Sequence, residues 1–140
     1  MRHLKLSDKN AKITGRYSAD GDVLWLIHSG SAAAFELTAS KAELTLKSDK
    51  DSGAYKDGKP RFAVFVNDKL VSDDVTGSEG VKITVLDSDS EKTAYVKIIH
   101  LSEAQSGAVG IAALEAESEA ADPVKPLPDK NTASNLSVIP

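Results

Sequence analysis

The chain has 140 residues, 41% of them hydrophobic and 27% charged, and a formal net charge of −4. This length suits a single domain that buries its own core, and 17 basic against 21 acidic residues, without a basic cluster, argue against nucleic acid as a partner. The absence of cysteine excludes disulfides, thiol catalysis and thiolate zinc sites.

Neither a membrane segment nor an export signal is evident. No apolar run approaches the roughly 18 residues that a membrane-spanning helix needs. The first ten residues, M-R-H-L-K-L-S-D-K-N, lack the long apolar core of a signal peptide. The sequence therefore predicts no membrane partner.

Apolar and polar residues alternate with period two along much of the chain. Alternation over 33–39, 42–47 and 81–85 predicts strands with one buried and one wet face. About eight or nine such strands predict an all-β fold, an antiparallel β-sandwich. Turn-rich stretches punctuate the strands at 19–22, 48–53, 56–60 and 87–91.

Three further strands, at 23–28, 61–67 and 94–101, are apolar on both faces. A two-layer sandwich needs only one apolar face per strand. Either a loop, a partner or a second domain covers one sheet, or long strands cross a curved sheet. If the three strands share a sheet, its outer face carries an apolar patch that predicts weak self-association.

The sequence His28-Ser29-Gly30-Ser31 raises the question of a hydrolase site. A nucleophile elbow needs G-x-S-x-G on a turn from a strand into a helix. Here no glycine precedes the serine at the required place, and a strand follows. Ser29 and Gly30 instead suit a tight connection between two strands.

Other candidate chemistry is sparse. The acidic loops at 49–57 and 87–91 could supply calcium ligands, but neither matches the calcium-hand spacing, so solvated turns are favoured. His3, His28 and His100 lie far apart in the sequence, and no metal or cofactor is predicted. Tyr17, Tyr55 and Tyr95 are the only aromatic residues left over for stacking on a sugar.

The C-terminal part changes character twice. A capping-box spacing over 101–107 predicts one helical turn, and composition over 110–121 favours helix. Three prolines lie within 122–129, which predicts an extended segment without regular pairing. We therefore expect a folded domain over 1–120 and a proline-rich linker and tail over 121–140.

Several segments together resemble a known domain, the N-terminal jelly roll of carbohydrate esterase family 2. The resemblance covers roughly residues 13 to 116 and also favours a strand over 108–115, against the helical composition. The segments that carry it are G-R-Y at 15–17, L-W-L-I-H-S-G-S at 24–31, K-A-E-L-T-L at 41–46, R-F-A-V-F-V-N-D-K-L-V-S-D-D at 61–74 and K-I-I-H-L-S-E-A-Q-S-G-A-V-G-I at 97–111.

The resemblance implies an antiparallel jelly-roll β-sandwich that lacks catalytic residues of its own. In that family the chemistry belongs to a following SGNH-type (GDSL-like) hydrolase domain, which removes acetyl groups from xylan or related sugars. It implies this hydrolase domain as a partner in the same polypeptide, a plant polysaccharide as a further partner, and a secreted or cell-surface location. Candidate residues for the interdomain contact or cleft rim are Trp25, His28, Arg61 and His100. The alternative is a stand-alone carbohydrate-binding or adhesion module.

Overall fold

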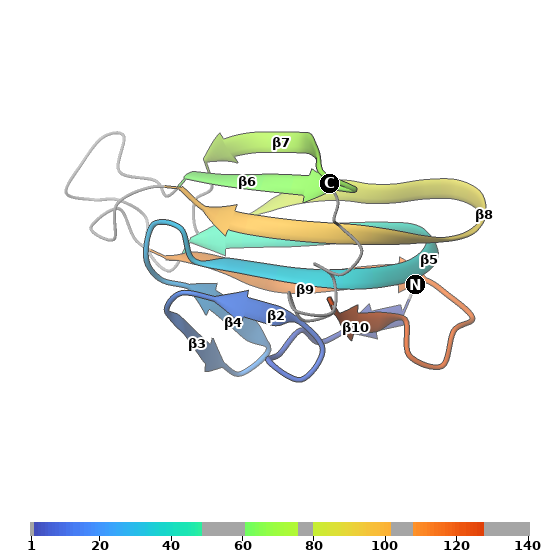
Figure 1. Ribbon diagram of the computed structural model, residues 1–140, viewed down its shortest axis with the longest axis horizontal. Helices are drawn as coiled ribbons and strands as arrows, with labels where there is room; N and C mark the ends of the chain where they lie inside the picture. The colour runs from blue at the N-terminus through green and yellow to red at the C-terminus, as the bar shows by residue number, and fades with distance from the viewer. Residues whose placement is uncertain (1, 49–60, 76–79, 102–107, 128–140) are drawn as a thin grey trace, which may run out of the picture.

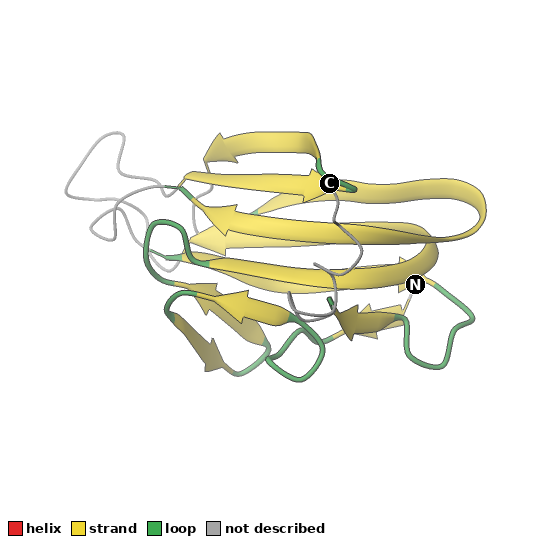
Figure 2. Cartoon of the chain, in the orientation of Figure 1, coloured by secondary structure: helices red, strands yellow, loops and turns green. Residues whose placement is uncertain are grey.

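The computed structural model describes residues 2–48, 61–75, 80–101 and 108–127, and every regular element in these ranges is a β-strand (Figures 1 and 2). The fold is an antiparallel jelly-roll β-sandwich, as predicted, and the described part contains no helix that could span a membrane. The strands are β1 (Arg2–Leu4), β2 (Lys12–Thr14), β3 (Tyr17–Asp20), β4 (Val23–Leu26), β5 (Ala32–Ser48), β6 (Arg61–Val66), β7 (Lys69–Val75), β8 (Val81–His100), β9 (Val109–Glu117) and β10 (Val124–Pro126).

Two long strands build the sandwich. β5 and β8 are 17 and 20 residues long and run the length of the molecule (Figure 1). The first half of β5 pairs with the second half of β8, and its second half lies between the first half of β8 and β9. Register shifts between Ala39 and Lys41 and between Ala42 and Glu43 mark the bend, because bulges increase the local twist of a strand. Both strands thereby take part in both layers.

The remaining strands extend the two layers. β6 and β7 continue the layer beside the second half of β8, while β2 and β10 pair with the first half of β5. β4 and β1 pair with β9 in the other layer, and β3 pairs with β4.

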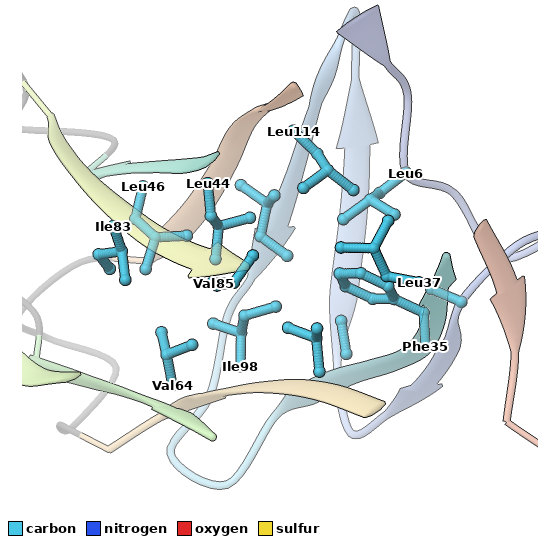
Figure 3. Close-up of a cluster of buried hydrophobic side chains, with 14 of the residues drawn as sticks. Leu6, Phe35, Leu37, Leu44, Leu46, Val64, Ile83, Val85, Ile98 and Leu114 are labelled. Carbon is cyan, nitrogen blue, oxygen red and sulfur yellow. The ribbon is translucent and has the colours of Figure 1, made fainter. Parts of the chain in front are cut away.

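The core lies between the layers and follows the period-two pattern. Alternate residues of β5 are buried, with Phe35 and Leu37 from its first half and Leu44 and Leu46 from its second half at 0% exposure. Side chains from both layers meet there (Figure 3). Burial of each such side chain stabilises the fold by about 1.5–3 kcal/mol.

The predicted turn at 87–91 is wrong. These residues continue β8, and Asp87 still pairs with Lys41 of β5. The acidic stretch lies where the two long strands pass together from one layer to the other. The register shifts there from Lys92 opposite Ala39 to Asp87 opposite Lys41, so residues 88–91 are extra residues on the β8 side of the pairing. Of the two alternatives given for the strands that are apolar on both faces, long strands that cross a curved sheet therefore apply to β8, which contains strand 94–101, and β5 behaves in the same way.

The prediction of one shared apolar outer face is wrong for strand 23–28. β6 and the second half of β8 are neighbours, with Ala63 opposite Ile99. β4 pairs with β3 and β9 instead, and its Leu24 and Leu26 are core residues.

The C-terminal segment also differs from prediction. β9 confirms the strand expected over 108–115. Regular pairing does not stop at Asp122, because β10 pairs with β5, Val124 is buried, and the Pro123 carbonyl accepts a hydrogen bond from Thr38 N at 2.8 Å. Proline lacks the backbone N–H donor but keeps its carbonyl, which can still accept a hydrogen bond from a neighbouring strand when the proline lies at the edge of a sheet. The predicted helical turn and the tail from 128 onward lie outside the described residues.

Candidate functional site

The stretch 27–31 forms a tight connection from β4 to β5. Ser31 N donates to the His28 carbonyl at 2.9 Å, and His28 N donates to Ser31 Oγ at 3.2 Å. Gly30 has φ +88°, a left-handed conformation that glycine adopts without steric cost. The turn predicted from Ser29 and Gly30 is confirmed.

This turn is tied to the end of β8 and, through it, to β6. Gly30 N donates to the His100 carbonyl at 2.7 Å, and His100 N donates to the Ser31 carbonyl at 2.9 Å. Leu101 N in turn donates to the Arg61 carbonyl at 2.8 Å. Three of the four candidate residues therefore come together at one end of the sandwich: His28, Arg61 and His100.

Both serines of the turn have structural roles. The Ser31 hydroxyl is 1% exposed and donates to the Arg16 carbonyl at 2.9 Å, while the Ser29 hydroxyl donates to the Leu101 carbonyl at 3.2 Å. A serine has one hydroxyl proton, and here each proton goes to a backbone carbonyl rather than to an imidazole base. This geometry is that of a scaffold turn and differs from a Ser–His nucleophile pair.

The three clustered candidates differ in what they offer a partner. His28 and Arg61 are exposed, whereas His100 is fully buried. Arg61 Nε lies 3.1 Å from Asp73 Oδ1 on the neighbouring β7, an ion pair open to solvent and worth at most about 1 kcal/mol. His100 positions the turn through its backbone, and His28 and Arg61 are the side chains available for contact.

Trp25 lies apart from these residues, on the outer face of β4. Gly110 of β9 is its pairing partner, and a Cβ built on Gly110 would lie 2.5 Å from Trp25 Cζ3. The indole thus covers the glycine, with Lys47 Nζ 5.9 Å from the ring centroid. A lone glycine in a strand pattern often marks such a close approach, so this packing carried a signal that the sequence analysis did not use.

Residues 89–91 of β8 line a small hollow where the strand bends. Asp89, Glu91, Glu117 and Glu119 surround about 250 Å³, and Glu91 accepts a hydrogen bond from the backbone amide of Glu119. The described residues contain no group of three or more histidine or acidic side chains placed to hold a metal ion. The other loop that was considered for calcium lies outside the described ranges.

The sequence model of the family "Carbohydrate esterase 2 N-terminal" matches residues 13–126, so the chain belongs to this family. No curated protein matches the chain.

Solved structures agree with the family. A family two carbohydrate esterase from Cellvibrio japonicus superposes with a TM-score of 0.72 at 17% identity, over 91% of this chain and 36% of the esterase. An acetyl xylan esterase from the rumen bacterium Butyrivibrio proteoclasticus gives 0.70 at 13%, over 91% and 34%. A family 36 carbohydrate-binding module in complex with calcium and xylotriose gives 0.54 at 15%, over 82% and 98%. This chain thus spans about a third of the length of those esterases.

Proposed function

We propose that this chain is the non-catalytic accessory β-sandwich of a carbohydrate esterase, whose SGNH-type hydrolase domain follows it in the same polypeptide. One observation carries the proposal. This chain belongs to the family of esterase N-terminal domains, and 91% of it aligns with only 36% of the Cellvibrio japonicus esterase, so most of that esterase has no counterpart here. The serines of the 27–31 turn have no catalytic geometry, so the chemistry is assigned to the remaining part of the parent protein. Action on acetylated plant polysaccharide favours a secreted or cell-surface location.

The role we assign to the sandwich is to pack against the hydrolase domain and to shape its substrate cleft. The end of the sandwich that carries His28 and Arg61 supports this role, because backbone hydrogen bonds join the turn to His100 and join Leu101 to Arg61. Rigid backbone lets exposed side chains contact a partner at little entropic cost. Trp25 offers a large, partly exposed indole on the outer face of the other layer, which makes it a separate candidate for contact.

The test uses the polypeptide encoded by the parent gene. Its mass should be about threefold that of this domain, in line with the 36% and 34% coverage of the esterases. We expect His28→Ala or Arg61→Ala to raise KM for acetylated xylan while leaving turnover of 4-nitrophenyl acetate unchanged, because the small ester does not need the cleft rim.

Tyr95→Ala is the control, since Tyr95 is 49% exposed on the outer face of β8 and lies outside the 27–31 turn. Equal kinetics for all three variants would overturn the assignment of a cleft rim to this end of the sandwich. A native polypeptide no longer than this domain would overturn the proposal as a whole.

A stand-alone carbohydrate-binding module is the second candidate function. The family 36 module, which binds xylotriose, and a family 35 module from an environmental isolate are matched over 98% and 99% of their lengths, with TM-scores of 0.54 and 0.56. A sandwich of this size is therefore enough for a complete binding module. A downstream coding region without a G-D-S strand–turn–helix would favour this candidate.

A further inference from the structure

A groove lies on the surface beside β2, between the 5–11 loop, the start of β3 and the end of β10. Its volume is about 540 Å³, which falls in the range of small-molecule sites. Ala11, Ile13 and Leu127 provide apolar lining, and Asp8, Lys12 and Tyr17 provide polar atoms. The groove thus combines an apolar strip with hydrogen-bonding groups.

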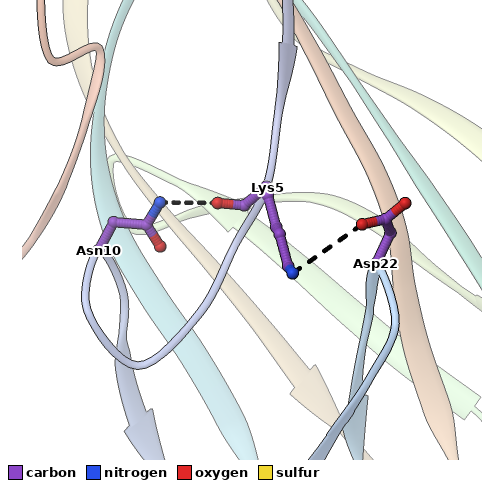
Figure 4. A network of polar contacts seen from close by, with 3 residues as sticks. All are labelled: Lys5, Asn10 and Asp22. Carbon is purple, nitrogen blue, oxygen red and sulfur yellow. Dashed lines mark hydrogen bonds and ion pairs between the residues drawn. The ribbon is translucent and has the colours of Figure 1, made fainter.

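Hydrogen bonds close the loop that carries Asp8. Ser7 N donates to Asn10 Oδ1 at 2.8 Å, and Asn10 Nδ2 donates to the Lys5 carbonyl at 2.7 Å, which closes the loop on itself. Lys5 Nζ lies 3.9 Å from Asp22 Oδ1 in the turn between β3 and β4 (Figure 4). The loop is therefore built before any ligand arrives.

Tyr17 is fixed against this loop. Its hydroxyl donates to Asp8 Oδ2 at 3.0 Å, and the residue as a whole is 38% exposed. The hydrogen bond and the negative charge of Asp8 raise the pKa of Tyr17, so the phenol stays protonated and keeps donating across the neutral range. An aromatic ring that is already oriented loses little conformational freedom when a ligand stacks on it.

We propose that this groove binds a short segment of a neutral β-linked pyranose chain, with the sugar ring stacked on Tyr17. The C–H face of a pyranose matches the apolar strip and the aromatic ring, and its hydroxyls match a carboxylate acceptor and an ammonium donor. Asp8 supplies that acceptor and Lys12 that donor. The proposal rests on the proposed function, because it assumes that the polysaccharide acted on by the esterase also contacts this domain.

The size of the groove favours a sugar over a protein partner. Stable protein interfaces bury more than about 1,000 Å² and involve some 20 residues on each side. Seven of the residues that the structure describes line the groove. A single oriented aromatic residue flanked by polar side chains is sufficient for a saccharide subsite and insufficient for a protein interface.

Calorimetric titration of this chain with xylohexaose and with cellohexaose tests the proposal. We expect saturable binding of at least one of the two, weakened about tenfold or more by Tyr17→Ala, since tenfold corresponds to the loss of one good stacking contact. Asp8→Asn should weaken binding less than Tyr17→Ala, because it keeps the ring. Tyr95→Ala is the matched control, because Tyr95 is an exposed tyrosine of β8 that does not line the groove, and this variant should bind like the wild type.

Three outcomes would overturn the proposal: no saturable binding of either sugar by the wild type, full affinity in Tyr17→Ala, or an equal loss in Tyr95→Ala. Thermal melts of each variant show that it is folded. The two proposals can fail separately: binding through Tyr17 by a chain whose parent lacks a hydrolase domain would refute only the accessory role. If the parent protein is an active esterase but its sandwich domain binds no sugar, only the proposed sugar site in the groove would be refuted.

Discussion

Replacement of Gly110 by alanine should destabilise the domain by forcing Trp25 from its position. The added Cβ would lie 2.5 Å and 2.6 Å from two indole carbons and 2.9 Å from Val23 Cγ1, all shorter than a van der Waals contact. Overpacking of this kind costs about 1–3 kcal/mol. Taking ~2 kcal/mol and roughly 3–5 °C per kcal/mol for a domain of this size, we expect Tm to fall by about 6–10 °C. Trp25 is the sole tryptophan, so its fluorescence reports the displacement directly.

A double-mutant cycle separates this clash from other effects of the new methyl group. In a Trp25→Ala background most of the cost should disappear, because alanine is otherwise favoured over glycine inside a strand by about 0.5–1 kcal/mol. A neutral Gly110→Ala in the wild-type background, with unchanged fluorescence, would refute the close packing of Trp25 on Gly110.

Three further predictions concern hydrogen bonds and strand pairing in the fold. Ser31→Ala should lower the free energy of unfolding in urea by about 0.5–1.5 kcal/mol, because it removes the acceptor of His28 N and one of the two donors to the Arg16 carbonyl. Ser29→Ala, at the exposed hydroxyl, should change it by less than about 0.5 kcal/mol. A chain that ends at Ala121 should have a lower Tm than one that ends at residue 127, because it loses β10 and the buried side chain of Val124. Equal Tm values would mean that the pairing of β10 with β5 adds nothing to stability. Because the pKa of Tyr17 is raised, its hydrogen bond to Asp8 stabilises the fold below pH 10.0, and this stabilisation is lost as the pH rises through the raised pKa. Asp8→Asn should therefore bring the pKa of Tyr17, followed by NMR at alkaline pH, back toward 10.0.

Much of the fold could be read from the sequence because one face of most strands is buried. Phe35 and Leu37 were correctly placed in the core by alternation alone, and the turn at Gly30 by its composition. The bends of β5 and β8 could not be found in the same way. Period-two alternation continues through a bulge, and the acidic residues of 87–91 look the same in a turn as in a solvent-exposed stretch of a long strand.

The candidate site was only partly accessible to sequence reasoning. The proximity of His28, Arg61 and His100 depends on three backbone contacts between distant strands, and no local pattern specifies these. The pairing of Tyr17 with Asp8 was missed for a related reason. The loop between the two residues is closed by Asn10, and its geometry becomes visible only in three dimensions.

The most direct measurement is the hydrolysis of acetylated xylan by this chain alone, beside the full polypeptide of the parent gene. We expect acetate release by the full polypeptide and none by this chain at equal molar concentration. Release by this chain that survives purification and disappears in Ser29→Ala, a variant expected to fold normally, would contradict the central claim that the sandwich is a non-catalytic accessory domain.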